Sequence, residues 1–591
     1  MNLNDLQVLA LDCQATGASP RKGHLLEIGW LQACAAKSVR SQAHRLRSYP
    51  VCLPPEFEIP RAVQRVTGIS KETFDKTRPL PSAEIWQKIA KTAGGIAAAD
   101  HMDRCPVIVH YARFEAPFLR NLYAESNRRG EFPLHLICTH EIAKRLLPGL
   151  PRKGLRAVAG YYGHTVPPSR RSADHVVATA VIWQNLIRQL EADQGIQELS
   201  QLTDWLDKTC VKKQTARVYP MKRKIRLNLP EKPGIYRMLR SNGDLLYIGK
   251  ATSLKHRVNS YFRQKGPGAE HTLEMLSQAA DLDVTLTGSA LEAALLESDE
   301  IKRHSPPYNV ALQKGRRELV FCSRDFRHCT AKPDKIQSIG PLPEGSITAA
   351  MTAFAVWHRN NRFANENEFC KVGYAILGVP QAYAPEPGCL AEGLALFRLN
   401  QQTRLTASSP LQIIKKLGHV LWQERLDALA NAELQTEAYG EDEEAVSPAA
   451  KPEAKPSWTP EMVARGIEKF TMRSALLIRR ARWLCLLSES SLAWEARDSG
   501  GRRKNILRFE SGKVAHRQEL DGEAEVPLST SGCARRIADR QKIFDLATYE
   551  RLRVVTTELR RLVAEDRKVE IHLAPNAILH RRQLARMLPW V

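Results

Sequence analysis

The sequence predicts an α/β protein of several domains, and three observations support this fold class. The chain has 591 residues, which is long enough for three or four domains. Strand-like and helix-like patterns alternate between residues 6 and 190, as they do in α/β domains. From residue 234, two apolar runs flank an Asn-Gly pair and precede a helical pattern, which predicts a second and smaller α/β unit.

Composition and patterning divide the chain into six segments. Residues 433–458 combine an acidic run with an Ala/Pro/Lys-rich run, which predicts a disordered linker. The other five segments are an α/β domain (1–192), a helix with a basic linker (193–229), a small α/β domain (230–312), an α+β region of unknown role (313–432) and a basic α+β C-terminal domain (459–591).

The first domain opens with a buried-strand pattern at Val8–Asp12, and Leu25–Leu31 is its expected partner strand. Helical periodicity follows at Ile85–Ile96. The run that starts at Val107 predicts a strand that breaks into a helix, and the last helix of the domain is expected near Ala178–Leu190. Such alternation favours a sheet covered by helices.

A hairpin is predicted at the start of the second domain, with strands at Gly234–Leu239 and Leu245–Gly249. The Asn-Gly pair between them supplies the positive φ values that a tight turn requires. Two tyrosines lie on these adjacent strands, Tyr236 and Tyr247, and Arg257 follows one turn into the next helix. The three side chains can therefore converge on one phosphate, although Tyr236 also fits a purely structural role as a core aromatic.

A helix is expected from about Ala290, and its spacing places Glu297 in an apolar stripe with Ala294 and Ile301. A carboxylate in an apolar stripe is unfavourable unless a metal ion or a cation compensates it. The alternative is a half-exposed glutamate that reaches outward to solvent.

In the C-terminal domain the patterns predict a helix at Met462–Leu487 and two strands, at Lys504–Phe509 and Lys513–Arg517. Two further helices are expected, at Phe544–Glu565 and Ala577–Met587. Arginine pairs are frequent here, which is compatible with nucleic acid but equally with solvated faces.

The charge balance points to a polyanionic partner. Lys and Arg outnumber Asp and Glu by 87 to 64, which leaves a net charge of +23. The twelve cysteines contain no CxxC pair, and Cys322 and Cys329 lack the spacing of zinc ligands, so we expect reduced thiols throughout. No signal-peptide pattern is expected at the N-terminus, and no run approaches the roughly 18 uncharged apolar residues of a membrane span.

Five short motifs from the second domain onward occur in the order of the GIY-YIG nuclease domain, in the form found in excision-repair endonucleases of the UvrC/Cho type. The resemblance covers about residues 233–310. The motifs are Pro233-Gly-Ile-Tyr236, Tyr247-Ile-Gly-Lys-Ala251, Leu254-x-x-Arg257-Val-x-Ser-Tyr-Phe262, Glu292-Ala-x-Leu-Leu-Glu297-x-x-x-Ile-Lys302 and Pro306-x-Tyr-Asn309-Val310.

This resemblance implies a role for each matching residue. Glu297 binds a single Mg²⁺ or Mn²⁺ ion, which polarises the scissile phosphate. Tyr236 and Tyr247 line the site, and Tyr247 is the general base or positions the attacking water. Arg257 holds the phosphate and stabilises the charge that develops on it.

Two further residues complete the implied site. Lys250 supports the tyrosine and the phosphate, and Asn309 orients the site. The family also implies a damaged DNA duplex as substrate and damage-recognition proteins of the UvrA/UvrB type as partners. A bacterial cytoplasmic, nucleoid-associated location and no membrane contact are expected.

The basic linker between the two α/β domains contains no acidic residue between Thr209 and Pro230. It is either a solvated tether or an arm that follows the phosphates of a nucleic acid. Its position beside the nuclease motifs favours the second interpretation. The predicted nucleic-acid contacts are Lys212, Lys213, Lys222, Arg223 and Lys224, together with His256 after the hairpin.

The first domain resembles the DnaQ-like (DEDDh) 3′–5′ exonuclease fold, an RNase-H-like mixed sheet with helices, over about residues 6–190. Acidic residues of that family bind two divalent metals, and a histidine activates water. At the matching positions this chain has Asp12, Glu115 and Asp174. The resemblance implies that these three residues are the ligands of a degenerate metal site.

The first domain departs from the exonuclease pattern. Gln14 replaces the second acid, and a neutral amide does not compensate divalent cations as a carboxylate does. The last motif permits two registers: His175 stands at the last acid with Arg170 at the general base, or Asp174 stands there with Ser169 at the general base. We therefore expect a domain retained for DNA binding or partner docking, with weak residual exonuclease activity as the alternative.

The first functional hypothesis is a metal-dependent DNA endonuclease of nucleotide excision repair that hydrolyses a phosphodiester next to a lesion. The second is a 3′–5′ exonuclease whose GIY-YIG domain is auxiliary, and the decay at Gln14 and His175 argues against it. The third is a non-catalytic DNA-binding scaffold, which has no need of a desolvated Glu297.

Overall fold

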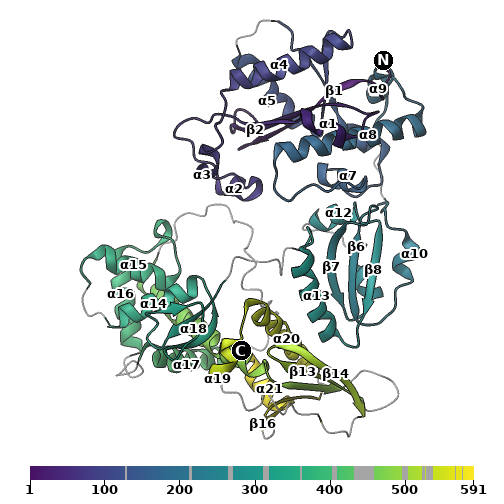
Figure 1. The fold of residues 1–591 in the computed structure, drawn as a ribbon. Helices are drawn as coiled ribbons and strands as arrows, with labels where there is room; N and C mark the ends of the chain where they lie inside the picture. Colours follow the sequence, from purple (N-terminus) through teal and green to yellow (C-terminus); the bar gives the residue numbers. More distant parts are fainter. Residues whose placement is uncertain are drawn as a thin grey trace. The chain divides into compact units, whose positions relative to one another are not determined.

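The structure is a computed structural model, shown as a ribbon in Figure 1. It describes residues 1–126, 130–211, 216–263, 270–309, 318–359, 363–401, 409–431, 458–495, 503–521, 526, 537–565, 568–574 and 577–590. Contacts group the chain into two units, Met1–Ala293 with Arg303–Val310 and Ala294–Lys302 with Ala311–Val591. The predicted α/β multi-domain class is confirmed, because each unit combines sheets with helices.

A mixed five-stranded sheet organises the first part of unit one, in the order β3-β2-β1-β4-β5. β1 pairs antiparallel with β2 and parallel with β4, and β4 pairs parallel with β5. The strands are β1 (Gln7–Ala15), β2 (Leu25–Cys34), β3 (Arg47–Pro50), β4 (Cys105–Val109) and β5 (Leu134–Cys138). The strands expected from the sequence near Val8, Leu25 and Val107 are all present.

Helices cover both faces of this sheet, because the apolar side chains of β1 alternate between two cores. Val8 and Ala10 pack with α8, whereas Leu9 and Leu11 pack with α4 and α5. The helices are α1 (Val39–Gln42), α2 (Arg61–Thr67), α3 (Lys71–Asp75), α4 (Ser82–Ala99), α5 (Ala112–Glu125), α6 (Thr139–Leu146), α7 (Leu155–Tyr161), α8 (Ser172–Gln194) and α9 (Leu199–Lys208).

A three-stranded antiparallel sheet in the order β7-β6-β8 forms the small domain. The predicted hairpin is confirmed, and Gly243 in its turn has a φ of +86°. The elements are α10 (Arg223–Leu227), β6 (Gly234–Leu239), β7 (Leu245–Ala251), α11 (Leu254–Tyr261), α12 (Glu270–Leu276), β8 (Asp281–Leu286) and α13 (Ala290–His304). Ser253 caps α11 by accepting a hydrogen bond from the His256 N–H.

Unit two contains two further sheets and their helices. A three-stranded sheet consists of β9 (Leu319–Ser323), β10 (Cys329–Thr330) and β11 (Gln337–Pro343), and a helical core of α14 (Ser346–Arg359), α15 (Glu366–Leu377), α16 (Pro387–Asn400), α17 (Pro410–Asn431) and α18 (Pro460–Leu487) lies beside it. The C-terminal sheet has the order β14-β13-β12-β15-β16. Its elements are β12 (Ser491–Glu495), β13 (Arg503–Glu510), β14 (Lys513–Asp521), α19 (Ile537–Lys542), α20 (Leu546–Ala564), β15 (Val569–Ala574), β16 (Ala577–His580) and α21 (Arg581–Met587).

Two expectations from the sequence are wrong in unit two. Ala577–Met587 is not one helix, because its first four residues form β16 and pair antiparallel with β15. Cys322 and Cys329 are not free thiols, because they face each other on the paired strands β9 and β10 and form a disulfide. Residues 433–457 of the predicted linker lie outside the described residues. Across the part of the chain that the structure describes, no helix has the length and apolar character that crossing a membrane requires.

Candidate active site

Three tyrosine hydroxyls meet at the edge of the small domain. Tyr236 on β6 is fully buried, and its Oη lies 2.8 Å from the Oη of Tyr261 on α11. Tyr261 in turn donates a hydrogen bond of 3.3 Å to the Oη of Tyr247 on β7. Since a hydroxyl has only one proton, Tyr236 must be the donor in its bond to Tyr261. The hydroxyls therefore form a directed chain that ends on Tyr247.

Arg257 completes this cluster from the outer side of α11. Its Nη2 donates to Tyr261 Oη at 3.3 Å, and the guanidinium carbon lies 5.0 Å from the centre of the Tyr261 ring. Partial burial lowers the pKa of the Arg257 guanidinium, but Tyr236 and Tyr261 outweigh this effect and hold that pKa above its ordinary value. Arg257 therefore stays positively charged, and the family resemblance gives it the role of holding the substrate phosphate.

Tyr236 is not a base in this arrangement. Burial, and then the neighbouring Tyr261 and Tyr247, raise the pKa of the Tyr236 phenol well above its ordinary value. The phenol therefore keeps its proton at neutral pH and acts as a donor. Both sequence interpretations of Tyr236 fit, since it is at once a core aromatic and a member of the cluster.

Position 249 must be a glycine because the Tyr236 side chain occupies the space that a Cβ would fill. The two residues are directly paired across β6 and β7, and a Cβ at position 249 would overlap the phenol oxygen of Tyr236 and the ring of Tyr247. The glycine of the strand motif therefore makes room for the tyrosine cluster.

Asn309 fixes the backbone of β7 beside Tyr247. Its buried side chain accepts from the Ile248 N–H at 2.9 Å and donates to the Ile248 carbonyl at 2.8 Å. Both polar groups of the amide are used, so this residue holds the strand in place. The contact is consistent with the orienting role that the sequence predicts.

Glu297 and Lys250 are the remaining predicted residues of this site. Lys250 lies on β7 and Glu297 on α13, and both side chains are half-buried. The middle of α13 groups with unit two, in which Lys302 pairs with Glu550 and Asp299 with Arg551. Within the described residues, no group of three acidic, histidine or cysteine side chains is arranged to hold a metal ion. A single carboxylate ligand from the protein fits a Mg²⁺ ion that keeps most of its water ligands.

The exonuclease-like centre has a different composition. Asp12 on β1 accepts a hydrogen bond of 2.6 Å from the Gln14 amide at Oδ2, and its Oδ1 lies 3.3 Å from His175 Nδ1 on α8. The structure thus selects one of the two registers that the sequence left open, because His175 and not Asp174 stands beside Asp12. Both oxygens of the Asp12 carboxylate are engaged by nitrogen groups.

Glu115 lies in the same buried centre. Burial, and then the negative charge of Asp12, raise the pKa of the Glu115 carboxyl to about 9. Its Oε2 has no hydrogen-bond partner in the described structure. Gln14 contributes a neutral amide where divalent cations require charged oxygens, so the set Asp12, Gln14 and Glu115 fits a pair of such cations poorly.

A fourth acid near this centre is held by an ion pair. Glu27 on β2 is directly paired with Gln14 and receives hydrogen bonds from Arg171 Nη2 at 2.6 Å and from the Ser172 N–H at 2.8 Å. Burial raises the pKa of the Glu27 carboxyl, but these bonds outweigh it and hold the pKa below its ordinary value. Glu27 is therefore ionised and is paired with a cation of the protein itself.

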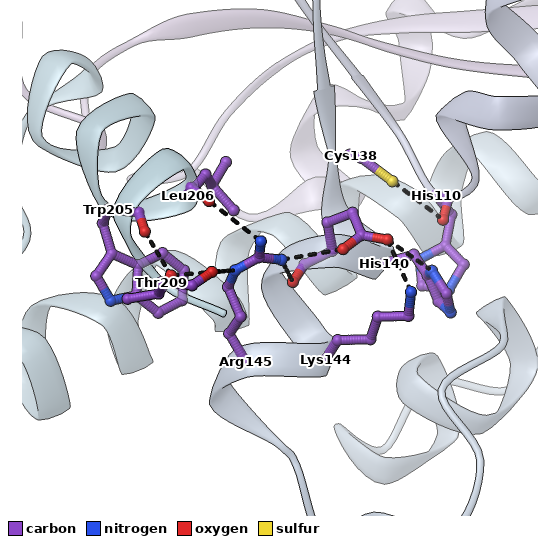
Figure 2. A network of polar contacts seen from close by, with 9 residues as sticks. His110, Cys138, His140, Lys144, Arg145, Trp205, Leu206 and Thr209 are labelled. Carbon is purple, nitrogen blue, oxygen red and sulfur yellow. Dashed lines mark hydrogen bonds and ion pairs between the residues drawn. The ribbon is translucent and has the colours of Figure 1, made fainter. Parts of the chain in front are cut away.

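The start of the basic linker is anchored on the first domain, as Figure 2 shows. Arg145 on α6 donates to the carbonyls of Leu206 and Thr209 at 3.1 and 3.0 Å, and Glu141 holds the same guanidinium. Lys144 donates to Glu141 beside it. The chain leaves α9 at this point, directly before the predicted basic arm.

The predicted nucleic-acid contacts are distributed along this linker. Lys212 and Lys213 lie outside the described residues. Lys222, Arg223 and Lys224 are exposed at the start of α10, whereas His256 is exposed on α11 at 3.7 Å from Glu231. The structure therefore presents three of the linker cations to solvent.

Tyr261 is the site residue that the sequence analysis did not single out. It belongs to the motif that contains Arg257 and follows it by four residues, which is one helical turn. This spacing was a usable signal, because side chains four apart lie on one helix face.

Known proteins match the chain in two ways. Residues 232–310 match the model of the UvrC-like GIY-YIG domain. The UvrABC system protein C of Psychrobacter sp. (strain PRwf-1) is 45% identical over 123 residues, which are 20% of this chain and 20% of that protein. A putative bifunctional exonuclease/endonuclease protein of Mycobacterium tuberculosis (strain CDC 1551 / Oshkosh) is 25% identical over 318 residues, which are 52% of this chain and 45% of that protein.

Solved structures are also similar to the small domain, and one of them serves as an example. It is the GIY-YIG N-terminal endonuclease domain of UvrC from Thermotoga maritima bound to its catalytic divalent cation, magnesium. The identity is 36%, the match covers 15% of this chain and 100% of that one, and the TM-score is 0.14. The chain spans a fifth of the length of the Psychrobacter relative and less than half of the Mycobacterium relative. The matches confirm the resemblance that the sequence predicts: residues 232–310 are a UvrC-like GIY-YIG domain, and an exonuclease-like region precedes it.

Proposed function

We propose that this chain is a metal-dependent DNA endonuclease of nucleotide excision repair, which hydrolyses a phosphodiester next to a lesion at its GIY-YIG site. The observation that carries the proposal is the directed hydroxyl chain from Tyr236 through Tyr261 to Tyr247, with Arg257 bound to it. A core of tyrosines that served packing alone has no need of a guanidinium at its edge. The net charge of +23 fits a polyanionic substrate.

The hydroxyl chain prepares Tyr247 for the attack step. The hydrogen bond that Tyr261 donates stabilises negative charge on the Tyr247 oxygen, which lets that oxygen attract a proton of the attacking water. Tyr247 therefore orients the water; once its own phenol proton has passed to solvent, its phenolate oxygen takes one proton from that water as the general base. Tyr236 is the first hydrogen-bond donor of this hydroxyl chain and remains neutral, because its proton stays on its own oxygen.

The charged residues act on the phosphate. Arg257 binds a non-bridging oxygen and stabilises the charge that grows on it, and Lys250 adds a second cation on β7. Glu297 would hold the Mg²⁺ or Mn²⁺ ion, which supplies Lewis-acid polarisation of the phosphate and neutralises the leaving oxygen when bound. Asn309 keeps β7, and with it Tyr247, in register with these groups.

The test is the nicking of a lesion-bearing duplex in the presence of Mg²⁺ by the full-length protein. Glu297→Ala and Arg257→Ala should each lower the single-turnover rate by roughly 10²–10³, as the loss of one charge-stabilising group does. Asp12→Ala is the matched control and should leave nicking unchanged. Nicking that persists in both nuclease variants would contradict the proposal.

A 3′–5′ exonuclease is the rival function, and the composition of the Asp12 centre argues against it. Both oxygens of Asp12 are engaged by nitrogen groups, and Gln14 is a neutral amide, so the centre has few charged oxygens for metals. End-labelled single strands decide between the two functions. Mononucleotide release that Asp12→Ala abolishes would support the exonuclease, and a DNA-binding scaffold would show neither activity.

The partners and the location follow from the same proposal. A damaged DNA duplex is the substrate, and proteins of the UvrA/UvrB type locate the lesion, as the name of the Psychrobacter relative suggests. Residues 230–312 are the nuclease domain, and the exposed cations of α10 contact the DNA beside it. Such a protein works in the bacterial cytoplasm at the nucleoid.

A further inference from the structure

Helix α7 of the exonuclease-like region packs against the nuclease domain, and both belong to unit one (Figure 1). At the start of α7, the Arg152 N–H donates to Ser277 Oγ at 2.9 Å, and the Arg152 guanidinium pairs with Glu270. One turn later, Arg156 forms an ion pair of 3.4 Å with Glu274. Ion pairs thus join α12 to the first turn of α7 and to the segment directly before this helix.

The loop after α7 holds the turn of the β6–β7 hairpin. Asn242 Nδ2 donates to the Gly163 carbonyl at 2.7 Å. Thr165 Oγ1 donates to Asp244 at 2.7 Å and accepts from Arg240 at 2.6 Å. These bonds connect the first domain to both ends of the turn.

Two buried residues of the nuclease domain, Arg240 and Gln278, take part in the contact with the first domain. Arg240 is 3% exposed, and its other donors bind Gln278 Oε1 at 3.1 and 3.0 Å. Gln278 fills a notch at Gly160, where any Cβ would overlap its side-chain amide. A buried guanidinium is unfavourable unless its donors are satisfied, and one of its partners here, Thr165, comes from the other domain.

From Gln278 the contact continues into the active site. Gln278 Nε2 donates to Tyr308 Oη, Tyr308 donates to Glu274 at 2.6 Å, and the Arg156 guanidinium lies 5.5 Å from the Tyr308 ring centre. Tyr308 directly precedes Asn309, whose amide holds Ile248 between Tyr247 and Gly249. A continuous path of contacts therefore leads from α7 through Gln278, Tyr308 and Asn309 to strand β7.

We infer that α7 of the exonuclease-like domain is a brace for the nuclease site: Gly160 and Arg156 seat Gln278 and Tyr308, and Tyr308 is a positioning residue that keeps Asn309 on strand β7. In this arrangement the exonuclease-like domain supports the nuclease site through the surface of α7, whether or not its own Asp12 centre is active. The inference rests on the proposed function for its activity readout only.

The experiment compares two glycine substitutions in the full-length chain. Gly160→Leu fills the notch, whereas Gly95→Leu, on α4 with no neighbouring atom within 4 Å, is the matched control. Hydrogen exchange of the amides of residues 246–249 should accelerate in Gly160→Leu and remain unchanged in Gly95→Leu. Arg156→Ala, which removes a charge without adding bulk, should accelerate the same amides.

Nicking under single-turnover conditions gives the second readout. The maximal rate at saturating DNA should fall about tenfold or more in Gly160→Leu and Arg156→Ala, because misplacement of a positioned group slows the chemical step. The DNA concentration for half-maximal rate should stay the same. If the wild-type chain nicks no duplex, the proposed function fails, yet the exchange readout still decides the inference. Unchanged exchange at residues 246–249 in both variants would overturn the brace.

Discussion

The hydroxyl oxygens of Tyr236 and Tyr261 lie 2.8 Å apart. Tyr236 is on strand β6, and Tyr261 is on α11, the helix that follows the β6–β7 hairpin. Because Tyr261 also accepts from Arg257 and donates to Tyr247, its hydroxyl uses both lone pairs and its proton. Tyr261 is therefore the residue through which Tyr236 and Arg257 act on Tyr247.

Tyr261→Phe should lower nicking about fivefold, since the lost hydrogen bond to Tyr247 is worth roughly 1 kcal/mol. The measurement is the single-turnover rate with Mg²⁺ on a lesion-bearing duplex. Tyr219→Phe is the control, because Tyr219 packs by its ring against Phe262 in the same domain. A rate for Tyr261→Phe equal to that of the control would show that the hydroxyl chain does not assist Tyr247.

Gly249→Ala should destabilise the chain by about 1–3 kcal/mol, as overpacking at a buried strand position does. The added Cβ overlaps the Tyr236 hydroxyl, so nicking should also be lost. The matched substitution is Gly95→Ala on α4, where a Cβ meets nothing within 4 Å; it should stabilise the helix by up to about 1 kcal/mol. Denaturant unfolding of both variants provides the comparison, and equal midpoints for the two would refute the close packing at Gly249.

Metal binding should depend on Glu297 and not on Asp12. A titration with Mn²⁺, followed by electron paramagnetic resonance of the free ion, should give one site in the wild-type chain. Glu297→Gln should remove that site and Asp12→Asn should retain it, because Asp12 is already engaged by Gln14 and His175. Additional sites in the wild-type chain that disappear in Asp12→Asn would instead indicate a working exonuclease centre.

Arg171→Ala should destabilise the first domain by about 1–3 kcal/mol, because it leaves the buried Glu27 carboxylate without its cation. This loss is smaller than the roughly 3–5 kcal/mol for a fully buried pair, since the Arg171 side chain is 43% exposed and water replaces some of its bonds. Arg170→Ala, at the adjacent exposed residue, is the control and should be nearly neutral. An equal loss of stability in both variants would contradict a specific role of the Glu27–Arg171 pair.

The stability that the Glu27–Arg171 pair contributes should change with pH in a direction that the Glu27 pKa determines. The pKa of Glu27 is lowered in the folded state, so its contribution is present above the unfolded-state value, close to 4.5, and is lost as the pH falls below it. In Arg171→Ala burial dominates and raises the pKa of Glu27, so stability should instead decrease as the pH rises above about 4.5. Thermal unfolding between about pH 2 and 8 measures both slopes, and parallel curves would contradict the assignment.

The elements that the sequence predicts well are those whose signals are local. The β6–β7 hairpin follows from Asn242-Gly243, whose turn lies between two apolar runs. The segment Ala577–Met587 was predicted wrongly because only its last seven residues form a helix. Its first four residues pair instead with β15, which ends at Ala574, and this pairing overrides the helical pattern.

The amino-acid sequence by itself determined the α/β class, the hairpin and the motifs that carry Tyr236, Tyr247 and Arg257. These depend on spacing along the chain, which the residues themselves display. Only the tertiary structure decided that Tyr261 joins the tyrosines, and that His175 and not Asp174 stands beside Asp12. The physical reason is that a hydrogen bond is made between atoms about 3 Å apart in space, and residues far apart in sequence reach that distance only when the sheet and its helices pack.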